Sequence, residues 1–174
     1  MVTVLRTSRA GSGTGPGSFD VAYQATSPVL GVTYHATEAL NLYANYGKGF
    51  ETPTLAEMAY KTDPTSATRL LGQFNTTLNA SSSQHYELGA KWTPSDTSRV
   101  DLALYQIDTV DEVVVLRSNL GQSAYKNAPG TSRTGWELSG STQLSPHVSA
   151  TASASMIDAR YTQSFTSGST AVAA

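Results

Sequence analysis

The sequence predicts an all-β fold, an antiparallel transmembrane β-barrel segment of about six or seven strands. Apolar and polar residues alternate with a period of two over six stretches of roughly ten residues, the length that a tilted strand needs to cross a bilayer. Short and long connections alternate between these stretches, as in bacterial outer-membrane barrels. Only 14% of the residues are charged, and Ser and Thr make up roughly a quarter of the chain. The polar face is therefore expected to be hydroxylated rather than ionic.

The chain begins with a predicted strand near residues 2–8 and a glycine-rich loop at 9–18. The loop loosely resembles a phosphate-binding loop, but no Lys-Ser/Thr pair and no helical pattern follow it, so a nucleotide site is not expected. Strands at 28–36 and 40–47 then form a hairpin around a tight turn at 37–39.

Residues 51–83 show no strand period and predict a long excursion, with one helical turn at 53–58 started by Pro53. The strand at 84–93 shows its two faces most clearly. One face carries Tyr86, Leu88, Ala90 and Trp92, and the other carries His85, Glu87, Gly89 and Lys91.

A short turn at 94–98 leads to a strand at 100–105, and residues 106–132 predict an extension of that strand, a loop and a return. Strands at 136–144 and 148–156 flank a turn at 145–147. The small residues at the end of the chain predict no closing strand.

Composition excludes several classes of protein. The net charge of −2 and the lack of a Lys/Arg run argue against nucleic acid as a partner. Without cysteine there is no Cys-based zinc site and no disulfide. No nucleophile or metalloprotease motif occurs, so no catalytic residue, no enzyme and no cofactor are expected. The first residues do not read as a signal peptide, which leaves two expectations: a cytoplasmic chain, or one whose beginning is missing.

Metal ligands are also not expected. The three histidines (His35, His85, His147) have no partner at ligand spacing. The cluster of Asp108, Asp111 and Glu112 could bind calcium or could be exposed loop charge, and the second interpretation is favoured.

Several motifs together resemble the barrel of TonB-dependent outer-membrane receptors, in the siderophore-receptor branch. They occur in that family's order and cover roughly residues 27–144. The motifs are Ser27-Pro28-Val29-Leu30-Gly31-Val32-Thr33-Tyr34, the run from Leu40 to Leu55, Tyr86-Glu87-Leu88-Gly89-Ala90-Lys91, Leu104-Tyr105, Asn127-Ala128-Pro129-Gly130 and Gly135-Trp136-Glu137-Leu138.

The resemblance implies a barrel of about 22 strands around a plug domain, in the outer membrane of a Gram-negative bacterium. Such a receptor takes up a ferric siderophore as cargo and is driven by the TonB complex. The sequence departs from this pattern because it lacks a plug domain, a TonB box and a terminal aromatic strand. We therefore expect residues 1–174 to be part of a receptor barrel domain, not transport-competent alone. Its partners would be outer-membrane lipid, the rest of the barrel and the plug, and TonB through the missing N-terminal region.

The candidate site residues follow from the two faces. Glu87, Lys91 and Glu137 are expected to face the lumen, where they could line a substrate path or contact a plug; cross-strand ion pairing explains them equally well. A lipid-facing aromatic girdle is expected at Tyr34, Tyr46, Trp92 and Trp136.

Two alternatives remain open. One is a complete eight-stranded outer-membrane barrel with a structural or adhesion role, which requires strands at both 1–8 and 19–26. The other is a soluble β-rich binding module with a packed core.

Overall fold

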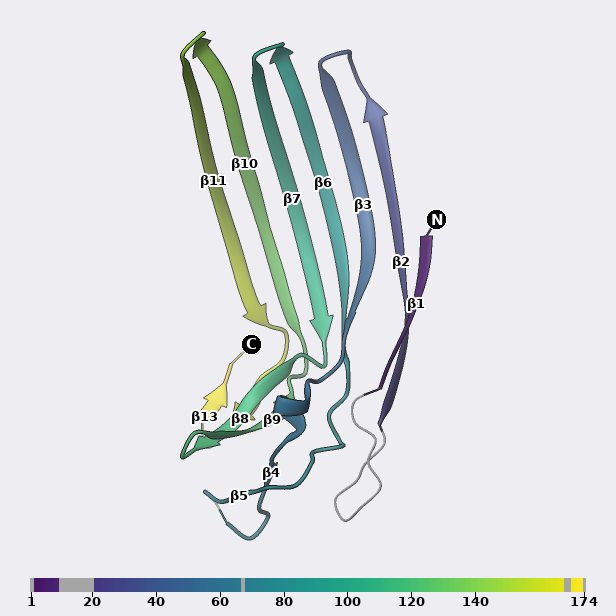
Figure 1. Cartoon of the computed structure of the whole chain (residues 1–174), viewed down its shortest axis with the longest axis vertical. Coiled ribbons are helices and arrows are strands. Elements are labelled where there is room, and N and C mark those ends of the chain that lie inside the picture. The colour runs from purple at the N-terminus through teal and green to yellow at the C-terminus, as the bar shows by residue number, and fades with distance from the viewer. Residues whose placement is uncertain (1, 10–20, 67, 168–169, 174) are drawn as a thin grey trace.

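The computed structural model describes residues 2–9, 21–66, 68–167 and 170–173. Seven long strands form one antiparallel sheet in which most neighbours in the sheet are also neighbours along the chain (Figure 1). The order is β1-β2-β3-β6-β7-β10-β11. The strands are β1 (Val2–Arg9), β2 (Ala22–His35), β3 (Leu40–Glu51), β6 (Ser81–Ser95), β7 (Ser98–Val110), β10 (Thr131–Ser145) and β11 (Val148–Tyr161). The predicted fold class is confirmed, and the strand near the N-terminus is the seventh.

The connections at one end of the sheet are all short, and this is the short-turn end, at the top of Figure 1. They are the turns at 36–39, 96–97 and 146–147, as predicted. In the first turn the Thr37 hydroxyl accepts hydrogen bonds from the amides of Ala39 (3.2 Å) and Leu40 (3.0 Å). The first turn is also joined to the end of β6, since the Thr93 amide donates to the Ala39 carbonyl at 2.8 Å.

The opposite end carries the described residues of 52–80, 111–130 and 162–173, which we call the loop layer. It contains α1 (Leu55–Met58) and three small hairpins: β4 (Lys61–Thr62) with β5 (Leu70–Leu71), β8 (Val113–Asn119) with β9 (Gln122–Asn127), and β12 (Phe165–Ser167) with β13 (Thr170–Val172).

Three details differ from the sequence predictions. The helical turn is capped by Thr54, which forms a capping box with Glu57, rather than started by Pro53. Residues 51–83 contain strand after all, because β3 and β6 extend into them and β4 and β5 lie within them. The end of the chain forms the β12–β13 hairpin, outside the main sheet. The predicted glycine-rich loop lies outside the described residues except for Arg9.

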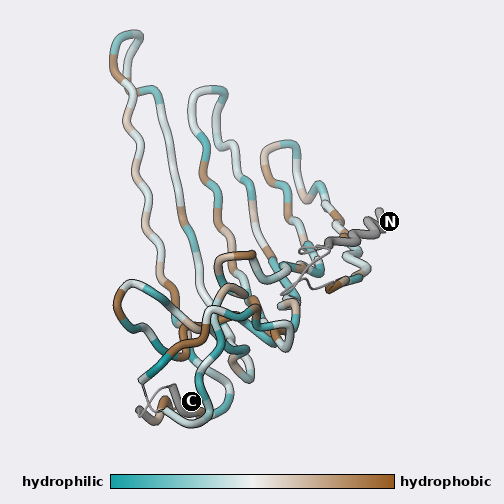
Figure 2. Tube along the Cα trace, turned by 60° about the horizontal axis from the view of Figure 1, so that its bottom comes forward, coloured by the Kyte–Doolittle hydropathy of each residue, from teal (hydrophilic) through white to brown (hydrophobic). Residues whose placement is uncertain are grey.

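The register shows that the sheet has two chemically different faces. Directly opposed residues of an antiparallel pair lie on the same face, and Ala44, Leu88, Leu104, Trp136 and Met156 form one such row. We call this apolar side the outer face and the other the inner face. Figure 2 shows the alternation of hydrophobic and hydrophilic residues along the strands.

Large hydrophobic side chains of the outer face are exposed, as Leu88 is at 60%. A soluble module would bury this face in a core, so that alternative does not fit. The eight-stranded alternative also fails, because residues 22–35 form one strand instead of two, and the sheet is open between β1 and β11. Within the described residues, no helix is long and apolar enough to cross a membrane.

Candidate functional site

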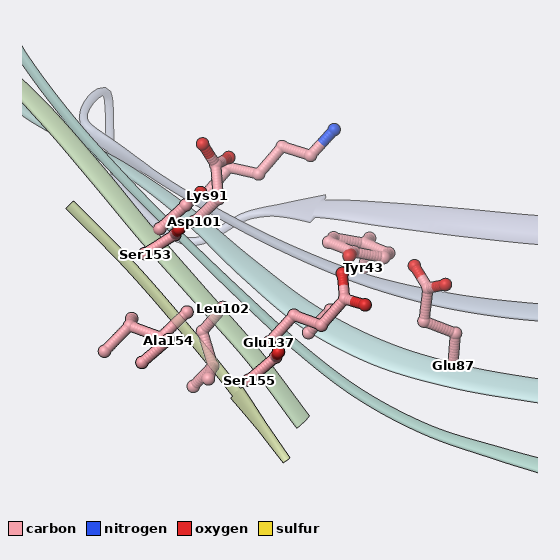
Figure 3. Close-up of a pocket in the computed structure, with 12 residues that line it drawn as sticks. Tyr43, Glu87, Lys91, Asp101, Leu102, Glu137, Ser153, Ala154 and Ser155 are labelled. Atoms are coloured by element: carbon pink, nitrogen blue, oxygen red, sulfur yellow. The ribbon is translucent and has the colours of Figure 1, made fainter. Parts of the chain in front are cut away.

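The inner face of the sheet carries a hollow of about 580 Å³ (Figure 3). The three predicted lumen residues, Glu87, Lys91 and Glu137, all line it, together with Tyr43 and Asp101. They come from β3, β6, β7 and β10, and the alternation of each strand turns them to the same side. The structure thus brings together residues that lie up to 94 positions apart in the chain, from Tyr43 to Glu137.

The charges of this hollow are only partly balanced. Lys91 lies directly opposite Asp101 in the register, and its Nζ lies 5.3 Å from the centre of the Tyr43 ring, a cation–π contact. Asp101 is bound by Arg99 on its own strand at 2.6 Å. Glu87 interacts with the Tyr43 hydroxyl, but neither Glu87 nor Glu137 forms an ion pair with any described residue. Opposed ionic neighbours therefore exist for Lys91 and not for the two glutamates.

The sequence interpretation missed Tyr43 as part of this site. Tyr43 is directly opposite Gly89 in the register, and a Cβ atom on Gly89 would overlap the Tyr43 ring. Tyr105 stands in the same relation to Gly135. In each pair the missing side chain leaves room for the ring of the neighbouring strand. The sequence offered no direct signal for this pair, because a long connection separates β3 from β6 and the register between them cannot be read from either strand.

The outer face holds the four residues predicted as an aromatic girdle. Tyr34 and Trp92 lie toward the short-turn end and are 67% and 48% exposed. Tyr46 is farther along and stacks at 5.2 Å, centroid to centroid, against Tyr86. Trp136 lies one row from this pair and is half-buried. Their positions on one face fit a girdle, which stays a prediction.

The loop layer has a small core of its own. The buried hydrophobic residues of the described chain all lie in it, and they are Met58, Leu78, Ala124 and Ala128. Helix α1 and strands β4 and β5 contact β9. The Asn75 amide donates to the Met58 carbonyl at 2.6 Å, and its side chain donates to the Tyr125 carbonyl at 3.2 Å. The loops therefore form one packed layer.

Two carboxylates of the loop layer, those of Asp63 and Glu112, form charged hydrogen bonds with neighbouring segments. Asp63 is nearly buried, and hydrogen bonds from the side chain and backbone of Thr65, with the charge of Arg69 at 2.8 Å, lower its pKa. Burial raises the pKa of Glu112, but hydrogen bonds from Arg133 and Thr131 outweigh burial, so the pKa is lowered overall.

The three carboxylates considered as a possible calcium site each bind a different protein group. Glu112 binds Arg133 at 2.8 Å, Asp108 accepts hydrogen bonds from Gln106 and Ser132, and Asp111 accepts one from Asn79. No group of three His, Cys, Asp or Glu residues in the described part of the chain is arranged to hold a metal ion.

A meandering sheet with an exposed apolar outer face and a charged inner face defines a stretch of β-barrel wall. The particular family follows from sequence comparison: the family described as "TonB dependent receptor-like, beta-barrel" matches residues 5–173. The chain belongs to this family, and the suspected resemblance is confirmed.

Solved structures share the fold at low sequence identity. The copper transporter OprC is 17% identical with a TM-score of 0.68, and the match covers 83% of this chain and 22% of that one. The siderophore receptor PirA from Pseudomonas aeruginosa is 17% identical with a TM-score of 0.63, covering 80% and 27%. The ferric yersiniabactin uptake receptor FyuA from Yersinia pestis is 19% identical with a TM-score of 0.60, covering 83% and 20%. The chain thus spans between 20% and 27% of these three relatives.

Proposed function

We propose that this chain is part of the barrel wall of an outer-membrane receptor that takes up a ferric siderophore. The observation that carries the proposal is the open seven-stranded sheet with an exposed apolar outer face and a charged inner face. Among the solved relatives, PirA and FyuA are named as siderophore and ferric yersiniabactin receptors, which supports this class of cargo. Since OprC is a copper transporter, a copper species is the second candidate.

The open sheet supports a role as one stretch of a larger wall. Strands β1 and β11 each have one neighbour in the sheet, so their outer edges carry backbone N–H and C=O groups that a lipid bilayer cannot satisfy. The remaining strands of a full barrel would pair with these edges. Alone, the seven strands would not be competent for transport.

We assign the two faces accordingly. The outer face contacts lipid, with Tyr34, Tyr46, Trp92 and Trp136 at the headgroup zones. The inner face contacts a plug domain, and the carboxylates of Glu87 and Glu137, which form no ion pair with a described residue, would accept hydrogen bonds from basic groups of that plug. The loop layer faces the outside and contributes to cargo binding. TonB would act through the plug, not through this segment, and no enzymatic step or cofactor is involved.

The proposal is tested by expressing the complete protein in a Gram-negative host lacking its own ferric-chelate receptors. Uptake of radioactive iron is measured with a panel of ferric siderophores and with a copper chelate. TonB-dependent iron uptake, with the protein in the outer-membrane fraction, is the expected result. Copper uptake without iron uptake would shift the cargo to the second candidate. A protein found in the soluble fraction would contradict the barrel assignment itself.

A further inference from the structure

We propose that Asn127 is a positioning residue that joins the two long loops of the loop layer where they meet the sheet, next to the start of β6 and the corner between β7 and β8. Asn127 is the last residue of β9, and its side-chain amide makes three hydrogen bonds to the backbone of other segments. Its Oδ1 accepts from the Asn79 amide at 2.8 Å. Its Nδ2 donates to the carbonyls of Asn79 at 2.9 Å and Asp111 at 2.7 Å. Both N–H groups and the oxygen of the side chain are therefore used.

The two bonds to Asn79 have the form of a strand pairing. In an antiparallel ladder, a hydrogen-bonded pair of residues exchanges one N–H and one C=O in each direction. Here the Asn127 side chain provides both partners for the backbone of residue 79, so the segment before β6 is attached to β9 without being a strand. The side chain of Asn79 adds only a 3.4 Å contact to Asp111 Oδ1. At residue 79 the attachment depends on one side chain, that of Asn127, while Asn75, Arg117 and Asn119 join the two loops at other points.

The third bond holds the corner between β7 and β8. Asp111 has a positive φ of 57°, a left-handed conformation that costs energy for residues other than glycine. Asn127 donates to the Asp111 carbonyl, and the next amide, that of Ala128, donates to the Glu112 carbonyl at 2.7 Å. The end of β9 thus fixes both residues of the corner.

The consequence is a cavity whose walls come from both loops. A hollow of about 390 Å³ lies between them, lined among others by Lys61, Asn75, Leu78, Tyr125 and Asn127. Its shape depends on the distance between the two loops, which Asn127 sets at residue 79 and Asn75 sets at Tyr125. Cargo binding by this layer rests on the proposed function. The role of Asn127 in holding the layer together does not depend on that proposal.

Backbone hydrogen exchange of the complete protein in detergent tests the inference, with Asn127→Ala compared with Asn79→Ala. Asn79→Ala is the control. It removes the side chain of the residue that Asn127 binds, but it leaves all three Asn127 hydrogen bonds in place because they go to backbone atoms. We expect the amides of Asn79 and Ala128 to exchange about ten- to a hundredfold faster in N127A, since each lost bond contributes about a factor of ten at most. They should be unchanged in N79A, and β6, β7 and β10 should be unchanged in both. Equal acceleration in both variants, none in N127A, or acceleration across the sheet would overturn the inference.

A rescue variant separates a positioning role from general damage. Asp111→Gly removes the backbone strain of the corner, because glycine adopts positive φ without penalty. In N127A it should restore protection of the Ala128 amide but not of the Asn79 amide. Failure to restore Ala128, or recovery of both amides, would contradict the assigned geometry. Binding of a ferric siderophore is measured in parallel and should weaken about tenfold in N127A alone. If the parent protein binds no ferric siderophore, the proposed function fails, while the exchange data still decide the role of Asn127.

Discussion

Substitution of Gly89 by Ala should destabilise the sheet because of one contact. A Cβ atom at this position would overlap the Tyr43 ring, so the ring has to move off β6. Overpacking of this kind costs about 1–3 kcal/mol. The lower backbone entropy of alanine in the unfolded chain returns about 0.5–1 kcal/mol. The two ranges leave a net loss of about 0–2.5 kcal/mol, with about 1 kcal/mol at their midpoints.

The assay is urea-induced unfolding of the complete protein in lipid vesicles, followed by tryptophan fluorescence. Gly140→Ala is the matched control, since its Cβ would meet only the Arg99 carbonyl at 3.7 Å and Val100 Cγ2 at 3.9 Å, which are ordinary contacts. G140A should be neutral or slightly stabilising.

A double-mutant cycle with Tyr43→Ala makes the test decisive. Without the ring, G89A should no longer destabilise and should instead stabilise by about 0.5–1 kcal/mol. If G89A costs the same in the presence and absence of Tyr43, the ring contact is not the cause and the reasoning is refuted.

Three further predictions concern the lipid face, the loop layer and the helix cap. Leu88→Arg should cost about 2–4 kcal/mol of folding free energy in vesicles, as expected for a cation facing the middle of the bilayer; a cost below 1 kcal/mol would place Leu88 away from lipid. The pKa of Glu112 is lowered in the folded protein, so its contribution to stability is present above the unfolded pKa of about 4.3. That contribution is lost as the pH falls through the lower folded value, so exchange in the loop layer should accelerate below about pH 4. Glu112→Gln should remove the part of this pH dependence that comes from Glu112 and leave the part that comes from Asp63, whose pKa is also lowered; an unchanged profile would contradict the assignment. Thr54→Ala should destabilise α1 by about 0.5–2 kcal/mol, measured as faster exchange of the Glu57 amide; no change there would show that the cap is dispensable.

The long strands could be predicted because each carries its own signal. At 84–93 every second residue is apolar, and this pattern by itself fixes which side chains share a face. The short turns were also predictable from proline: Pro146 directly follows the end of β10, and Pro94 lies next to the last residue of β6, at the register irregularity between Trp92 and Ser95. The elements of the loop layer could not be predicted, because they are short and their residues show no periodic pattern of hydrophobicity. Strands β4 and β5 have two residues each, and tertiary contacts hold them in place.

The candidate site divides in the same way. The alternation of side chains along each strand predicts that one face carries Glu87, Lys91 and Glu137. Which of them are paired is only partly contained in that pattern. The Lys91–Asp101 pair spans the short turn at 96–97, whereas the neighbours of Glu87 on β3 and of Glu137 on β7 lie across long loops. The register places Asp101 of β7 opposite Lys91, and it leaves Glu137 opposite Ala103 and Ser155, with no cation facing it among the described residues.

By itself, then, the sequence determined the two faces of the sheet and the family to which its strands belong, while the strands proved longer than predicted, at 12–15 residues from β2 to β11 in the main sheet. The alternation of side chains along a strand is a local property of the backbone. Tertiary structure alone decided that Tyr43 lies over Gly89 and that the Asn127 amide binds the backbone of Asn79 and Asp111. These contacts join segments far apart in the chain, and they form only after the strand register has brought those segments together.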